Sequence, residues 1–333
     1  MHILKGYTKQ EISWMMYDWA NSAHSVIIVT LLPIFFDTVA GYTADSVSSM
    51  STWGYATSIA MLIVALAAPF LGVFGDIRGM RKKLFSFFML LGVAACAGMA
   101  FTPGMDFTSG PVAAGKVASL ILVLYIVSVI GFDASAIYYD AFLTDVTTED
   151  RMDKVSTMGY GLGYIGGSTI PLLIFLIMNL VGVPMLTCLA FVFGLTAVWW
   201  LAFSLPLLKN CEQTSGKPYE KGDVARSIKG VGTTIKEIIA NKPMLIYILS
   251  YFFYIDGVHT VISMATTYGT NLGLDSTGMM LALLLVQILG LPFCLLYIKC
   301  SEKFGARTMV GFGICVYMFI CIFAFFMNSL WQV

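Results

Sequence analysis

Long apolar segments alternate with short polar segments along the whole chain. Each apolar segment is long enough for a helix that crosses the hydrocarbon core of a membrane, which takes about 20 residues. In order, these segments cover residues 13–36, 52–75, 83–102, 116–139, 156–181, 184–207, 243–270, 277–299 and 306–328. The pattern predicts an all-α polytopic membrane protein with nine transmembrane helices.

The basic residues fall almost entirely in alternate connections between these segments. Of the 19 Lys and Arg residues, only Lys116 lies in a connection of the opposite parity. Because Lys and Arg are enriched in cytoplasmic loops, we predict a cytoplasmic N-terminus. The first apolar segment contains Asp18 and is longer than the apolar core of a signal peptide, so we expect it to stay in the protein.

Composition supports the membrane assignment and excludes other classes. The chain is 58% hydrophobic and 11% charged, with a mean hydropathy of +0.84, whereas soluble domains are about 25% charged. A net charge of zero provides no basic field for nucleic acid. The seven cysteines include no CxxC pair and no cluster with histidine, so we expect reduced thiols that pack between helices, and no metal site.

One long polar connection divides the predicted helices into two sets. We predict a six-helix bundle over residues 1–207, a cytoplasmic linker over 208–242 and a three-helix bundle over 243–333. Within the linker, apolar residues from Ile228 to Ile238 recur at helical intervals opposite basic residues. This predicts a short amphipathic helix, which either lies on the inner membrane surface or is a solvated linker helix.

A charged turn follows the second predicted helix and occurs again after the eighth. The first turn has the sequence GVFGDIRGMRKK at residues 72–83, and the second has EKFGAR at residues 302–307. Both contain an acid, a glycine and a base in the same order. The repeat predicts that the chain is internally duplicated. The residues of interest in the two turns are Asp76, Arg78, Gly79, Arg81, Glu302 and Arg307.

This layout resembles that of the major facilitator superfamily, and four motifs resemble its vacuole-effluxer branch. The motifs are YDWANSA at 17–23, YYDAFLTD at 138–145, GYGLGYIGG at 159–167 and DGVHTVI at 256–262. That branch groups fungal vacuolar amino-acid effluxers with bacterial relatives. The resemblance implies helical bundles with a pseudo-twofold repeat and alternating access across twelve helices. With nine of twelve present, it implies that the second bundle is incomplete.

Two interpretations of the charged turns remain open. The charges can act as topological anchors alone, as the bias of Lys and Arg toward the cytoplasm already requires. The resemblance favours a cytoplasmic gate, in which salt bridges hold this side shut and break when the bundles rock.

Ionisable side chains within the apolar segments are the main functional signal, because a charge at the bilayer centre costs at least about 2.5 kcal/mol. The candidates for substrate binding and proton coupling are Asp18, Asn21, His24, Asp133, Asp256 and His259. Asp18 and Asp133 each lie about six residues inside the predicted cytoplasmic end of a helix, which is about 9 Å deep. Equal depth predicts a polar pocket that the two acids share with Asn21.

Asp256 and His259 form a second candidate pair at the predicted midplane of the membrane. Their spacing places both on one face of a helix. The sequence HTVI at 259–262 also repeats HSVI at 24–27. We predict a proton site here, and the alternative is a histidine that is hydrogen-bonded for packing.

Glycines in the fifth predicted helix match a nucleotide-binding pattern by accident. Gly161, Gly163 and Gly166 satisfy GxGxxG, but the pattern lies inside an apolar helix and does not follow a strand. Gly159, Gly163 and Gly167 recur every fourth residue, which instead predicts a small-residue face for close helix packing.

The sequence therefore predicts a secondary transporter of a small polar metabolite, with possible proton coupling and without a cofactor. The resemblance suggests a neutral amino acid, moved by efflux. The alternative is a membrane scaffold or receptor with the same fold. We expect no enzyme, because no GxSxG or HExxH motif occurs, and no ATP-driven pump, because no GxxxxGK[ST] loop occurs. Expected partners are the substrate, the lipid bilayer and protons, in a bacterial cell membrane or, alternatively, a vacuolar membrane.

Overall fold

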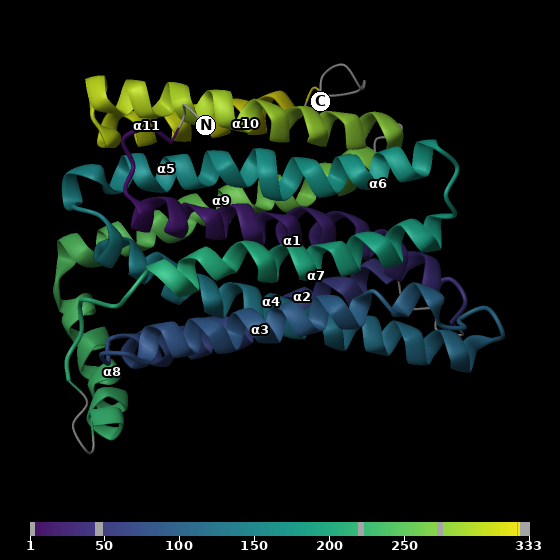
Figure 1. Cartoon of the computed structure of the whole chain (residues 1–333), viewed down its shortest axis with the longest axis horizontal. Coiled ribbons are helices and arrows are strands. Elements are labelled where there is room, and N and C mark those ends of the chain that lie inside the picture. The colour runs from purple at the N-terminus through teal and green to yellow at the C-terminus, as the bar shows by residue number, and fades with distance from the viewer. Residues whose placement is uncertain (1–3, 44–48, 219–222, 272–275, 325, 327–333) are drawn as a thin grey trace. The chain divides into compact units, whose positions relative to one another are not determined.

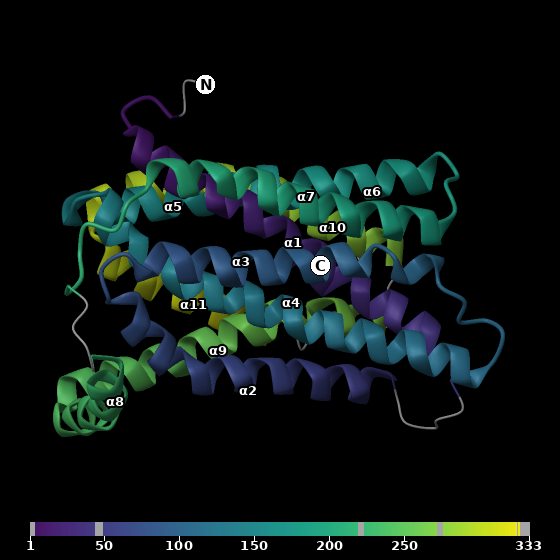
Figure 2. The same cartoon turned by 60° about the horizontal axis from the view of Figure 1, so that its bottom comes forward.

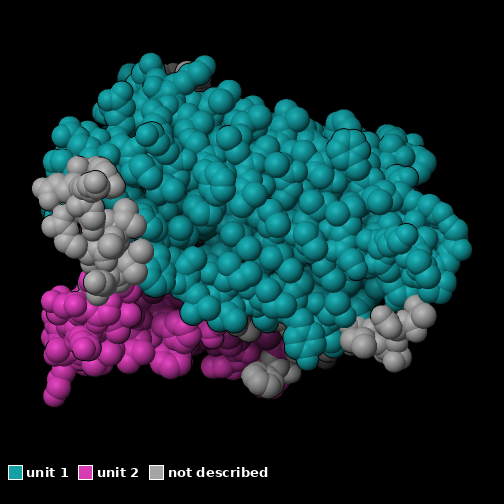
Figure 3. Space-filling view, turned by 90° about the horizontal axis from the view of Figure 1, so that it is seen from below, with its two compact units in different colours: residues 1–221 teal, residues 222–333 magenta. Residues whose placement is uncertain are grey.

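The computed structural model describes residues 4–43, 49–218, 223–271, 276–324 and 326. The chain divides into two compact units, residues 1–221 and residues 222–333 (Figure 3). Of the described helices, eight are long and apolar enough to cross a membrane, or nine if a bent pair around residue 241 is one span. The prediction of an all-α polytopic membrane protein is therefore confirmed.

The first unit is a bundle of long helices that run side by side (Figure 1, Figure 2). The helices are α1 Lys9–Ala40, α2 Ser49–Gly75, α3 Met80–Met99, α4 Pro111–Val146, α5 Met152–Leu162, η3 Gly163–Thr169, α6 Ile170–Leu180 and α7 Met185–Asn210. Two short 3-10 helices, η1 Thr102–Gly104 and η2 Glu149–Arg151, lie in the connections. The segment η3 is π-helical and joins α5 to α6 without a break, so the three form one span.

Helix α1 lies among the other helices of this unit and packs against α4, α5, η3 and α7. Its first turn is fixed by a capping box, in which Thr8 and Glu11 exchange side-chain and backbone hydrogen bonds. The apolar residues of α1 lie on all of its faces, as is expected of a buried helix. Trp14 and Tyr17 are among its fully buried side chains, which leaves their polar atoms dependent on partners within the bundle.

Helix α4 is longer than the sequence predicts, and this corrects the distance of Asp133 from the end of its helix. The helix continues to Val146 rather than ending at residue 139. Asp133 therefore lies 13 residues from that end, about 20 Å along the axis, rather than about 9 Å. Asp145 lies in the added part of the helix, where its side chain is buried against Arg81.

The second unit contains α8 Asp223–Ala240, α9 Lys242–Asn271, α10 Ser276–Phe304 and α11 Ala306–Ala324. Helices α8 and α9 meet at a sharp bend of 97°. Between α10 and α11, Gly305 has a φ of 83°, and Gly79 between α2 and α3 has a φ of 82°. Only glycine adopts this conformation readily, so the two charged turns share their backbone geometry as well as their sequence.

Candidate functional site

A polar cluster lies inside the first unit, where α1 faces α4. Asp18 is buried and accepts a hydrogen bond from the Tyr139 hydroxyl at 2.8 Å. The Trp14 indole donates to the Tyr139 carbonyl oxygen at 2.9 Å, and the two rings stack with centroids 4.3 Å apart. Trp14 therefore fixes Tyr139, and Tyr139 fixes the carboxylate of Asp18.

Further along α1, Tyr17 extends this cluster to α7. Its hydroxyl lies 2.8 Å from the Ser135 hydroxyl oxygen and accepts from the Trp200 indole at 3.3 Å. Asn21 is also buried, one helical turn after Asp18. The cluster thus joins three helices through side chains that would be costly to leave unpaired in the membrane.

His24 lies two turns beyond Asp18 in the same buried interior. Its Nε2 is 3.2 Å from the Ser128 hydroxyl, and its ring stacks on Phe132 with centroids 4.8 Å apart. Trp200 also contacts the ring, at 5.2 Å between centroids. Within the described part of the chain, the buried Nδ1 of His24 has no hydrogen-bond partner. The same holds for the buried Oδ2 of Asp133 on α4.

The predicted glycine face lies directly against α1. A methyl group on Gly167 would lie 2.6 Å from the Trp19 carbonyl oxygen and 2.7 Å from Ser22 Cβ. One on Gly163 would lie 2.5 Å from Ser22 Oγ, and one on Gly159 would clash with the Asp18 carboxylate. The glycines therefore bring α5 and η3 into backbone contact with the part of α1 that carries Asp18.

The candidates in the second unit have a different environment. Asp256 and His259 lie on α9 and are both exposed. Glu302 and Arg307 lie on either side of the α10–α11 turn and are exposed as well. These four residues belong to the second unit, and the cluster around Asp18 belongs to the first.

A second polar cluster surrounds the turn between α2 and α3. Arg81 is buried and forms an ion pair with Asp145 at the end of α4. It also donates to the Ala141 carbonyl oxygen at 2.9 Å and lies 3.9 Å from the carboxylate of Asp76. The Asp76 side chain is 81% exposed, so Asp145 is the main ion-pair partner of Arg81 and Asp76 is the weaker one.

A third cluster ties the start of α1 to the connection between α4 and α5. Glu11 accepts hydrogen bonds from Arg151 Nε at 2.8 Å, Arg151 Nη2 at 2.9 Å and the Thr147 hydroxyl at 2.7 Å. The sequence does not single out Glu11, Arg151 or Asp145 as site residues, because charges near helix ends are also expected from membrane topology. The signal for Asp145 was its place in the YYDAFLTD motif.

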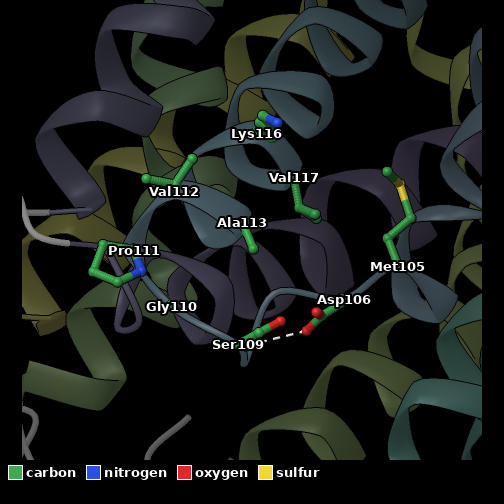
Figure 4. A pocket seen from close by; sticks show the side chains of 9 residues that line it. All are labelled: Met105, Asp106, Ser109, Gly110, Pro111, Val112, Ala113, Lys116 and Val117. Atoms are coloured by element: carbon green, nitrogen blue, oxygen red, sulfur yellow. Dashed lines mark hydrogen bonds between the residues drawn. The ribbon is translucent and has the colours of Figure 1, made fainter.

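An open cavity of about 520 Å³ lies elsewhere in this unit, at the start of α4 (Figure 4). Asp106, Ser109 and Lys116 are its polar lining residues. The Asp106 carboxylate accepts from the Ser109 amide at 3.1 Å and so closes the loop on itself. None of the predicted site residues lines this cavity.

Apolar membrane-spanning helices, buried polar clusters and a repeated charged turn together define a multi-pass membrane protein of the transporter class. A family model described as "Vacuole effluxer Atg22 like" matches residues 7–332, so the chain belongs to the vacuole effluxer Atg22-like family. This confirms the resemblance found in the sequence.

Individual relatives agree with the family. The chain is 39% identical to the "Uncharacterized MFS-type transporter YxiO" of Bacillus subtilis, over 98% of this chain and 76% of that protein. It is 24% identical to "Autophagy-related protein 22-1" of Penicillium rubens, over 50% of this chain and 30% of that protein. A partially occluded, inward-open structure of the xylose transporter XylE from E. coli aligns with 89% of this chain and 73% of that chain, at 13% identity and a TM-score of 0.47. The family and the Bacillus relative support an MFS-type transporter.

Proposed function

We propose that this chain is a secondary transporter that moves a small polar metabolite across a bacterial membrane by alternating access, with its N-terminus in the cytoplasm. The observation that carries the proposal is the polar cluster sealed inside an apolar bundle. Asp18, Asn21 and His24 are buried there, on a helix long and apolar enough to cross a membrane. Such groups are expensive in a bilayer and persist where function needs them. The name of the family supports efflux. The resemblance of this chain to amino-acid effluxers makes a neutral amino acid the first substrate to test.

Proton coupling is the second part of the proposal. Among the residues that the structure describes, none bonds to the buried Oδ2 of Asp133, and Asp256 and His259 share one face of α9. An acid at this depth can take a proton in one conformation and release it in another, as the access of water changes. We propose Asp256 with His259 as the coupling pair, and Asp18 with Asp133 as the acids to examine if that pair is not involved.

Transport into proteoliposomes against an imposed pH gradient tests this proposal, with a screen of small polar metabolites. We expect Asp256→Asn to abolish proton-driven accumulation while it leaves substrate exchange, because the substitution keeps the shape and removes the charge. His259→Gln should shift the pH dependence of transport, because glutamine can form hydrogen bonds but cannot take up a proton. If both folded variants accumulate substrate with unaltered pH dependence, the proton role of the pair is refuted. A protein that moves no solute in the screen would favour a scaffold or receptor.

A further inference from the structure

Seven residues that follow α7, Cys211–Lys217, lie across the turn between α2 and α3, and we call them the strap. The main chains of the two segments pair directly: the Arg78 amide donates to the Lys217 carbonyl oxygen at 3.0 Å, and the Lys217 amide donates to the Asp76 carbonyl oxygen at 3.1 Å. Gly216 has a φ of 110°, and a methyl group there would lie 2.6 Å from the Asp76 carbonyl oxygen. The strap thus approaches the turn as closely as only glycine permits.

The side chain of Gln213 binds the backbone of the same turn at three points. Its Oε1 accepts from the Gly79 amide at 2.8 Å and from the Arg81 amide at 3.3 Å. Its Nε2 donates to the Gly75 carbonyl oxygen at 3.0 Å. These atoms are the last carbonyl of α2 and the free amides at the start of α3, which have no partner within their own helices. One amide side chain therefore sets where α2 ends and where α3 begins.

Asp145 holds the other side of the strap. Its Oδ1 accepts from the Thr214 amide at 3.1 Å, the Thr214 hydroxyl at 2.8 Å and the Ser215 amide at 2.9 Å. Its Oδ2 pairs with Arg81. The carboxylate therefore connects α4, α3 and the strap, and Arg81 reinforces this connection by donating to the Ser215 hydroxyl at 3.2 Å.

The first residue of the strap is enclosed by the bundle. Cys211 is completely buried, and its carbonyl oxygen accepts from Lys82 Nζ at 3.1 Å. Burial raises the pKa of the Cys211 thiol to about 12. Because the thiolate is the reactive form, this thiol should react slowly with alkylating reagents while the strap is in place.

We propose that the strap is a fixed part of the cytoplasmic gate, and that Gln213 is the residue that positions the charged turn. The inference rests on the proposed transport function and on the interpretation of the charged turn as a cytoplasmic gate rather than a topological anchor alone. The exposed Asp76 carboxylate is then held at a defined place by backbone contacts to the strap rather than by its own side chain. The connection between the bundles therefore does more than tether them, because its first seven residues set the geometry of the gate.

The test uses the full chain in lipid nanodiscs, with Gln213→Leu and Gln213→Ala as the disruptive variants. Gln213→Glu keeps the acceptor for the Gly79 and Arg81 amides, and Lys217→Ala removes an exposed side chain while it leaves the main-chain pairing intact. The first readout is the rate at which N-ethylmaleimide alkylates the native Cys211, measured by mass spectrometry of the peptide. The second is the distance distribution between spin-labelled unnatural residues at Asp150 and Lys299, measured by electron paramagnetic resonance.

We expect Cys211 to react about tenfold faster or more in the Leu and Ala variants, because each net hydrogen bond changes a local equilibrium by about threefold to tenfold. Alternating access predicts two distances between the labels at Asp150 and Lys299, a shorter one with the cytoplasmic side closed and a longer one with it open. The population of the longer distance should increase in the Leu and Ala variants. Gln213→Glu should lie between these variants and the unmodified protein, because it keeps the acceptor and loses the donor to the Gly75 carbonyl oxygen. Lys217→Ala should match the unmodified protein.

Three outcomes would count against these ideas in different ways. Unchanged Cys211 reactivity in the Leu and Ala variants would overturn the strap contact itself. Faster alkylation with unchanged label distances would show a structural tie only and overturn the positioning role. A single label distance in the unmodified protein, both with and without a pH gradient, would instead refute alternating access. The reactivity of Cys211 would still decide whether Gln213 holds the strap.

Discussion

At the scale of single residues, carboxylates at the ends of helices join separate segments of the first unit. Glu11 is 1% exposed and uses both of its oxygens, one of them to cap its own helix. Asp145 divides its two oxygens between the strap and Arg81. Charge-assisted hydrogen bonds of this kind are about twice as strong as neutral ones. In the sequence these acids only indicate the ends of membrane helices, whereas in the structure they link separate segments through hydrogen bonds and ion pairs.

Replacing Glu11 with Gln tests this role. The substitution keeps the size of the side chain and removes the charge that holds Arg151, so we expect a loss of about 1–3 kcal/mol in stability. Thermal melting in detergent measures the change, and Arg151→Gln in the Glu11→Gln background should cost little more. Fully additive losses in this double-mutant cycle would show that the pair does not act as a unit.

At the scale of elements, the contact between α1 and η3 depends on the absence of side chains. Gly163 and Gly167 lie where a methyl group would meet backbone atoms of α1, and backbone cannot move aside as a side chain can. The segment is also π-helical, a form that is rare and often found at functional sites. Close packing here places η3 next to the part of α1 that carries Asp18.

Gly167→Ala should therefore destabilise the protein by about 1–3 kcal/mol, the usual cost of overpacking. Gly115 on α4 is a matched control, because a methyl group there would have no atom within 4 Å. Gly115→Ala should be neutral or stabilise by up to about 1 kcal/mol, since alanine favours helices. Melting temperatures of both variants in the same detergent give the comparison. Equal effects at the two positions would contradict close packing as the function of Gly167.

Helix α8 is the second element with a prediction of its own. It bends by 97° from α9, and its apolar side chains Ile235 and Ile239 are 48% and 58% exposed. A helix at right angles to a membrane span has room to lie along the membrane surface, where apolar side chains enter the lipid. We propose this interpretation of the amphipathic segment over a solvated linker helix.

Nitroxide labels at Ile239 and at Glu237 distinguish the two interpretations. At Ile239 we expect greater accessibility to oxygen, which dissolves in lipid, than to a water-soluble nickel chelate. At Glu237, on the opposite face, we expect greater accessibility to the nickel chelate than to oxygen. Water-like accessibility at both positions would show that α8 is solvated.

At the scale of the whole molecule, the distribution of bases predicts one orientation in the membrane. Single cysteines at Ser109 and Lys217 test it, because both positions are exposed and lie in connections on opposite sides. An impermeant thiol reagent applied to intact cells should label position 109, and label position 217 only after the cells are opened. The reverse pattern would overturn the cytoplasmic placement of the N-terminus.

The sequence by itself determined the class of the protein, its membrane helices and its family. Apolar length and composition suffice for the helices, because a bilayer requires every span to satisfy its own backbone hydrogen bonds. The motifs around Asp18 and Asp145 lie in segments that contribute to two of the buried polar clusters.

Only the tertiary structure decided which polar side chains meet. Asp18 pairs with Tyr139, and Arg81 pairs with Asp145 rather than chiefly with Asp76. Gln213 gave no signal in the sequence, since nothing in a polar linker marks one amide as different from its neighbours. The physical reason is that these pairs join residues over 60 positions apart, as in Arg81 with Asp145. Their geometry depends on how far each helix extends and how it is rotated, and the pattern of apolar and polar residues fixes neither with that accuracy.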